Sequence, residues 1–200
     1  MIAQRCLDLL HRVASTGWGY DLCSVLTGSP LTRPKWRKFY QSCSGLVLDL
    51  GGGTGVVAQF LPPNCSYVCL DIEMPKLRGL AAAHHGRGVL ADSRWMPIRT
   101  GTVDFLTCHA VTHHLTDKEL DQVLIEAARV LKPDGQFLIA DALWNPSRPA
   151  SRALWAMDRG SHPRSLCDLK QLLENRFAVV QQTQFALYHQ YAAFTCVRLD

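Results

Sequence analysis

The spacing of hydrophobic residues changes repeatedly along the chain from residue 45 onward. Short, wholly apolar runs are typical of strands buried on both faces, and apolar residues spaced three and four apart indicate helices. Strands are predicted at 46–50, 67–72, 88–91, 103–108, 137–140, 178–186 and 191–199. Helices are predicted at 54–61, at 73–84, after Thr116 and after Ser165. This alternation predicts an α/β domain with a mostly parallel sheet.

Two helix starts have strong local signals. Thr116 is followed three residues later by Glu119, and Ser165 by Asp168, which is the spacing of a capping box. The first helix places its apolar residues on one stripe, namely Leu120, Val123, Leu124, Ala127 and Leu131. A turn is expected at 133–135, where proline, aspartate and glycine are adjacent.

The chain divides into two parts by pattern. Residues 1–44 are expected to form a helical and irregular elaboration that begins with an amphipathic helix at 1–16, and residues 45–200 form the core. The last two strands have no helix between them, so they are expected to pair as an antiparallel hairpin. Ligands bind beyond the carboxyl ends of the strands in such sheets. We therefore expect 1–44 and 144–165 to fold over that edge as a partial lid.

Composition narrows the class of protein. Its 200 residues suit one domain, and 48% apolar with 19% charged residues are typical of a globular chain. No apolar run is long enough to cross a membrane, and the start lacks the apolar core of a signal peptide. We therefore expect a cytoplasmic protein whose eight cysteines are free thiols. Cys69, Cys108 and Cys196 lie in apolar runs and are predicted to be core residues.

Charge is concentrated in one short stretch. The net charge is +4, and residues 31–40 account for all of it. This stretch interleaves four basic residues with aromatic ones: Arg33, Lys35, Trp36, Arg37, Lys38, Phe39 and Tyr40. Basic and aromatic side chains together suit single-stranded RNA, which leaves an RNA acceptor open as one hypothesis. The rest of the sequence has no nucleic-acid-binding signature.

A glycine loop follows the first predicted strand. Gly51, Gly53 and Gly55 allow positive φ angles and close approach of a ligand, and their N–H groups could face an anion. Residues 53–58 also fit a dinucleotide fingerprint, which would suit an NAD(P)-dependent reductase. Against a reductase, no tyrosine from residue 20 onward is followed four residues later by the lysine of its usual catalytic pair.

The loop and four later segments resemble the class I S-adenosylmethionine-dependent methyltransferases. The matching features are Asp49 with the three glycines, Asp71 at the end of the second strand, Asp92 and Ser93 after the third, 109–115, 131–135 and 158–165. The resemblance covers about residues 45–199. It implies a Rossmann-like, doubly wound, mostly parallel seven-stranded sheet with a reversed last strand. It also implies a small-molecule methyltransferase that uses S-adenosylmethionine by in-line displacement. A non-catalytic S-adenosylmethionine-binding module stays open as an alternative.

The resemblance assigns residues to the cofactor. At the amino-acid end of S-adenosylmethionine, the ammonium group would meet Asp49, and the carboxylate would meet the loop of Gly51, Gly53 and Gly55. His109 would line the same end of the cofactor. Asp71 would accept from the ribose hydroxyls, because a carboxylate is an acceptor-only group. The adenine would lie near Asp92, Ser93, Ile72 and Trp95, with Asp92 accepting from its amino group.

Histidines are the candidates for catalysis. A neutral imidazole accepts a proton near pH 7, so His109, His113 and His162 are candidate bases, and Trp144 is a candidate wall of the acceptor pocket. One of His113 and His114 is expected to pack inward.

No metal site is predicted, because the spaced pair His109 and His113 lacks a third ligand and zinc takes three or four. The oligomeric state is left open.

Overall fold

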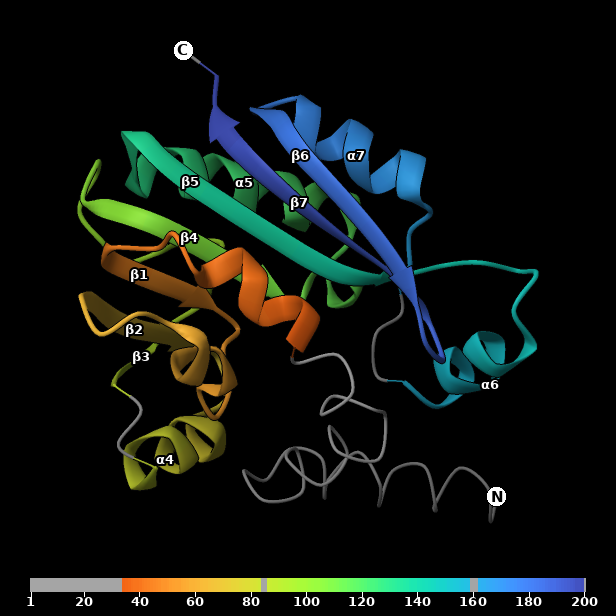
Figure 1. Ribbon diagram of the computed structural model, residues 1–200, viewed down its shortest axis with the longest axis horizontal. Helices are drawn as coiled ribbons and strands as arrows, with labels where there is room; N and C mark the ends of the chain where they lie inside the picture. Colours follow the sequence, from red (N-terminus) through yellow and green to blue (C-terminus); the bar gives the residue numbers. More distant parts are fainter. Residues whose placement is uncertain (1–33, 84–85, 159–161, 200) are drawn as a thin grey trace.

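The computed structural model describes residues 34–83, 86–158 and 162–199, and these form one mixed sheet with helices on both faces (Figure 1). The strands are β1 (Gly45–Leu50), β2 (Cys65–Asp71), β3 (Arg87–Leu90), β4 (Val103–His109), β5 (Leu131–Leu143), β6 (Phe177–Ala186) and β7 (Gln190–Arg198). The α-helices are α4 (Met74–Ala82), α5 (Asp117–Val130), α6 (Pro149–Met157) and α7 (Leu166–Glu174). Three short 3₁₀ helices are η1 (Lys38–Tyr40), η2 (Val56–Phe60) and η3 (Thr112–His114).

The sheet confirms the predicted fold class. Its strand order is β3-β2-β1-β4-β5-β7-β6, with the first five strands parallel and β7 antiparallel to both of its neighbours. The carboxyl ends of β1 to β5 therefore meet at one edge. The tip of the β6–β7 hairpin lies at the same edge, because Leu143 pairs with Gln190.

The two faces of the sheet carry separate apolar layers. On one face, α5 and α7 cover Leu48, Leu106 and Ile139, and on the other, η1 and η2 cover Val47, Phe105 and Leu138 (Figure 1). Neighbouring strand residues alternate between these faces. Consequently Asp49 and His109 point to the η1 side, whereas Asp141 points to the α5 side.

The predicted helix caps are confirmed. Thr116 and Glu119 exchange hydrogen bonds at the start of α5, and Ser165 and Asp168 do the same at the start of α7. The apolar residues predicted on one stripe, from Leu120 to Leu131, are all buried. Cys69, Cys108 and Cys196 are buried as predicted, and the six described cysteines are free thiols.

Two predicted elements differ from the structure. The helix expected at 54–61 is the five-residue 3₁₀ helix η2, because Gly55 takes a left-handed φ of 82° and delays its start. The turn expected at 133–135 lies within the bounds of β5. The predicted turn instead interrupts the pairing of β4 with β5. Val103 pairs with Leu131, but the next paired residue of β4, Phe105, pairs with Gln136, so residues 132–135 have no partner in β4.

Some predicted residues lie outside the described part of the chain, and one observed helix was not predicted. The helix expected at 1–16 and the residues His84 and His85 lie outside the described residues. Helix α6 was not predicted, and it lies beside the β6–β7 tip (Figure 1). No helix in the described part of the chain is long and apolar enough to cross a membrane.

Candidate functional site

The glycine loop after β1 is held by hydrogen bonds within the protein. The φ angles of Gly51, Gly53 and Gly55 are 65°, 58° and 82°, in the left-handed region that glycine tolerates. Their N–H groups donate to Leu70 O, Asp71 Oδ2 and Gly52 O at 2.7, 3.0 and 2.9 Å. These three N–H groups therefore do not face a ligand as expected, and the close approach of a ligand to the glycines stays a prediction.

Asp49 lies under this loop and has no access to solvent. Its Oδ2 accepts the Tyr67 hydroxyl at 2.6 Å, while its Oδ1 is buried with no hydrogen-bond partner. Burial raises the pKa of Asp49 to about 7, with the Tyr67 bond opposing and the charge of Asp71 adding to the shift. An orphaned carboxylate oxygen is a place for a donor, so this site fits the ammonium group of an amino-acid ligand. The sequence did not single out Tyr67.

The loop leaves no room for a side chain at Gly52. A Cβ there would lie 2.3 Å from Asp49 Oδ2 and 2.9 Å from Cys69 Sγ. We expect Gly52→Ala to displace Asp49, to lower the free energy of unfolding by about 1–3 kcal/mol and to weaken ligand binding at the loop. Chemical unfolding and calorimetry would measure both. Gly101→Ala is the control for binding, because a Cβ there meets nothing within 4 Å. Its left-handed φ of 63° makes alanine cost about 1–2 kcal/mol, so both variants are expected to lose stability and only Gly52→Ala to lose binding. Equal binding by the two variants would contradict this prediction.

Asp71 closes the loop from the end of β2. Its Oδ2 accepts from Gly53 N and its Oδ1 accepts from Glu73 N at 2.7 Å. A carboxylate has about four lone-pair positions, so two bonds leave acceptor capacity for hydroxyl groups.

Exposed apolar side chains gather beside Asp71. Ile72 is 67% exposed, Trp95 is 64% exposed, and Leu90 pairs with Asp71 in the sheet and is half exposed. Isolated exposed apolar residues are ordinary, but a group at the ligand-binding edge of a parallel sheet offers a surface for a flat ring.

Asp92 and Ser93 follow β3 as predicted, but Asp92 has a partner. Arg94 donates to both Asp92 oxygens, at 3.0 Å from Nε and 2.6 Å from the terminal nitrogen, and it also pairs with Glu119. The bonds from Arg94, partly opposed by burial, lower the pKa of Asp92. Ser93 is half-buried. The assignment of these two residues to adenine stays a prediction.

His109 is the last residue of β4 and packs against Trp36 from the segment before η1. The ring centroids are 4.3 Å apart at 67°. Burial, partly opposed by the charge of Asp141, lowers the pKa of His109 to about 4, so the imidazole is neutral at pH 7. The next residue, Ala110, has a left-handed φ of 58°, an uncommon conformation outside glycine that is often found at functional sites.

A row of rings extends from His109 around this edge of the sheet. Trp36 contacts Phe185 at 4.8 Å, and Tyr191 lies 5.2 Å from Phe185 and 6.0 Å from His189, measured between centroids. The row ends with Trp155 of α6, which lies 5.0 Å from His189. Its members come from β4, the segment before η1, α6 and the β6–β7 hairpin, so sequence spacing alone does not reveal the row.

His113 lies at the other end of the row and is the member of the histidine pair that packs inward, as predicted. Its Nδ1 donates to Asp141 Oδ1 at 2.6 Å, and its ring lies 5.2 Å from Trp155. Burial favours the neutral imidazole, but the Asp141 carboxylate outweighs burial and raises the pKa of His113. Burial likewise opposes ionisation of Asp141, yet the charge of His113 and hydrogen bonds lower the Asp141 pKa to about 2.

The segment that contains His162 runs along the loop after β4. The His162 N–H donates to the His113 carbonyl at 3.0 Å. Arg164 is buried, and its guanidinium donates to the carbonyls of Thr112 and Leu115 at 2.7 and 2.6 Å and to Asp117 at 2.7 Å. The sequence analysis did not single out Arg164. Trp144, the predicted wall of the acceptor pocket, is half exposed. Its backbone N–H donates to the Arg164 carbonyl.

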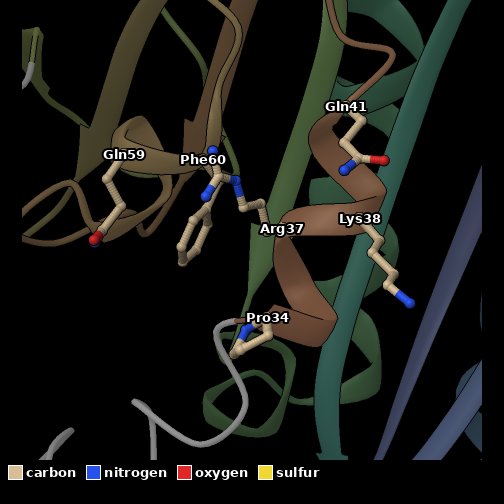
Figure 2. A pocket seen from close by; sticks show the side chains of 6 residues that line it. All are labelled: Pro34, Arg37, Lys38, Gln41, Gln59 and Phe60. Atoms are coloured by element: carbon tan, nitrogen blue, oxygen red, sulfur yellow. The ribbon is translucent and has the colours of Figure 1, made fainter.

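The basic stretch forms a separate surface. Figure 2 shows Arg37 reaching from the helical turn before η1 toward Phe60 of η2, beside a cavity of about 390 Å³ also lined by Lys38. Trp36 and Tyr40 are buried in the core, so they are not available to stack on bases. Phe39 is half-buried against the same core. The structure therefore removes two of the three aromatic side chains on which the RNA hypothesis depends.

Comparisons with known proteins agree with this architecture. The sequence profile described as "Methyltransferase domain" matches residues 48–139. The chain is 31% identical over 163 residues to the ubiquinone/menaquinone biosynthesis C-methyltransferase UbiE of Idiomarina loihiensis, covering 74% of this chain and 61% of that protein. It is 31% identical over 167 residues to the UbiE protein of Escherichia coli O1:K1, covering 76% and 64%. The chain thus spans about three fifths of the length of these relatives.

A solved structure shows the same fold. The geranyl diphosphate C-methyltransferase of Streptomyces coelicolor, in complex with S-adenosyl-L-homocysteine, superposes with a TM-score of 0.66 at 14% identity. The match covers 85% of this chain and 81% of that one.

Proposed function

The chain carries a methyltransferase domain of the class I, S-adenosylmethionine-dependent type, and on this premise we propose that the protein transfers a methyl group to a small-molecule acceptor. The observation that carries the proposal is the buried, orphaned oxygen of Asp49 beside a loop too tight for a Cβ at Gly52. Asp71, with acceptor capacity left, suits ribose hydroxyls. The exposed surface of Ile72 and Trp95 suits adenine.

The bound cofactor supplies an electrophilic methyl group, and the chain's residues position the reactants and exclude water. His109 is the proposed base, because its imidazole is neutral at pH 7 and lies at the carboxyl end of β4 against Trp36. The sequence also offers His113 and His162 as candidate bases. His113 contacts Asp141, and the His162 backbone holds the 109–115 loop, which supports positioning rather than proton transfer.

The acceptor is proposed to be a small, flat, largely apolar molecule. The half-buried rings of Phe185, His189 and Tyr191 offer aromatic surface next to the packed pair of Trp36 and His109, and such surfaces favour stacked or edge-on contacts with another ring. The names of the UbiE relatives point to quinone chemistry in those proteins.

We propose that the segments carrying Trp36 and α6 form the lid expected from the sequence. The free thiols of the six described cysteines support the expected cytoplasmic location.

Cofactor binding is tested by calorimetry with S-adenosylhomocysteine. We expect Ile72→Asp to weaken binding by about tenfold or more, because it replaces apolar contact area with a charge. Val180→Asp is the matched control, since Val180 is 58% exposed on the distant edge strand β6 and its substitution is expected to leave binding unchanged.

A folded wild-type protein that binds no S-adenosylhomocysteine would overturn the proposed function. Wild-type binding unaffected by Ile72→Asp would overturn the adenine assignment alone. Transfer of labelled methyl groups to panels of quinols and phenols would then identify the acceptor.

A further inference from the structure

Three potential metal ligands converge where η3 meets the end of α6. One nitrogen of His113, one nitrogen of His114 and one carboxylate oxygen of Asp158 all lie within 4.8 Å of one another. Sequence spacing suggested the pair His109 and His113, which lacks a third ligand. The structure brings together a different set, because Asp158 follows α6 and is 45 residues from His113.

The distances fit a shared ion. His113 Nε2 and Asp158 Oδ1 are 3.7 Å apart, which is longer than a hydrogen bond. Two ligands held about 2.1 Å from one tetrahedral zinc ion are about 3.4 Å apart. The His113 and His114 rings are 4.2 Å apart between centroids at 45°, so the tight turn of η3 holds both near Asp158.

A buried carboxylate fixes the orientation of His113. Asp141 accepts from His113 Nδ1, so Nε2 is the ring nitrogen that faces Asp158. Asp141 is itself held by the Thr112 hydroxyl and by the Ala142 N–H at 2.7 Å. Metal-binding histidines almost always donate their second ring N–H to such an acceptor, which fixes the ring.

The described residues around the group hold the turn in place. Arg164 and His162 bind the η3 segment through backbone contacts, and Trp155 packs on the His113 ring. His113 is buried, whereas His114 and Asp158 are exposed, so an ion could enter from solvent.

We propose that His113, His114 and Asp158 form a site for a divalent zinc ion with one coordination position left open. Two imidazoles and one carboxylate are ligands that zinc prefers, and three protein ligands with an open fourth position are typical of zinc sites that bind a further small molecule. The proposal rests on these three side chains and not on Asp49, Asp71 or the other residues assigned to the cofactor.

The test is calorimetric titration of zinc chloride into the full chain after treatment with a chelator. We expect one zinc ion per chain and a loss of affinity of about 100-fold or more in His114→Ala and in Asp158→Asn. Both side chains are exposed, so the variants are expected to fold, which circular dichroism verifies. Asp134→Asn is the matched control, because Asp134 is exposed at the opposite edge of the sheet, and it is expected to bind zinc as the wild type does.

Cobalt gives an independent readout. Bound Co²⁺ should produce visible absorption bands in the wild type that are lost in the two site variants. Absence of zinc binding, or equal affinity in the wild type and the site variants, would overturn the proposal. Either result would leave S-adenosylhomocysteine binding, and thus the proposed function, unaffected.

Discussion

Asp49→Asn is expected to make the protein more stable at pH 8 and to remove most of its affinity for S-adenosylhomocysteine. Asp49 is fully buried, and its pKa in the folded state is about 7, against an ordinary value of 3.8. The folded protein therefore holds a proton that the unfolded chain releases between these values. Stability falls as the pH rises through this window, and the full cost is present above pH 7.

The size of the effect follows from the pKa. A shift of about three units corresponds to about 4 kcal/mol at about 1.4 kcal/mol per unit. Asparagine is neutral and has the same shape, and its carbonyl can still accept the Tyr67 hydroxyl. We expect a melting temperature at least about 5 °C above the wild type at pH 8 and less than half of that difference at pH 5, which lies only about one unit above the ordinary pKa of 3.8.

Cofactor affinity should change in the opposite sense. The wild type should bind S-adenosylhomocysteine more tightly as the pH rises from 6 to 8, because an ionised Asp49 attracts the ammonium group. The asparagine variant should bind weakly at every pH in this range. Calorimetry across pH measures both proteins.

Asp104→Asn is the matched control. The pKa of Asp104 is lowered by its pairing with Lys132, so its neutral variant should be less stable than the wild type at pH 8. An Asp49→Asn protein that is no more stable than the wild type at pH 8, or that keeps full affinity, would contradict this account.

Arg164→Ala is expected to lower the free energy of unfolding by about 3 kcal/mol. Removing this buried guanidinium takes one donor from each of the carbonyls of Thr112 and Leu115 and removes the ion pair of Asp117. The melting temperature should fall by about 6–12 °C.

Thermal and urea unfolding would measure this change. Arg176→Ala is the control, because the pair of Arg176 with Asp121 is exposed and worth about 0–1 kcal/mol. Equal losses in the two variants would show that burial of Arg164 adds nothing.

Local signals in the sequence predicted much of the fold. The capping boxes at Thr116 and Ser165 and the apolar runs of the strands depend on neighbouring residues only, and all of them appear in the structure. Helix α6 was missed because Arg148 at its N-cap offers no capping side chain, in contrast to Ser165 of α7, so no local start signal marks it. The 3₁₀ form of η2 depends on the φ angle of Gly55, which composition does not specify.

The sequence predicted less of the candidate site than of the fold. Asp49 and Asp71 follow a recognisable spacing. The Tyr67 contact and the pairing of His113 with Asp141, however, join residues 18 and 28 positions apart through the sheet register. Arg164 has no signature, because three of its acceptors are backbone carbonyls. Such contacts become visible only once the strands are paired.

The interruption in the pairing of β4 with β5 has a practical consequence. Residues 132–135 lie outside the ladder at the amino edge of the sheet, opposite the glycine loop and the ring row. Pro133 and Asp134 are exposed there. Extra residues between them would lengthen a connection that already departs from the regular pattern. A fluorescent dye or affinity tag inserted at this position would report on the protein without touching either proposed binding site.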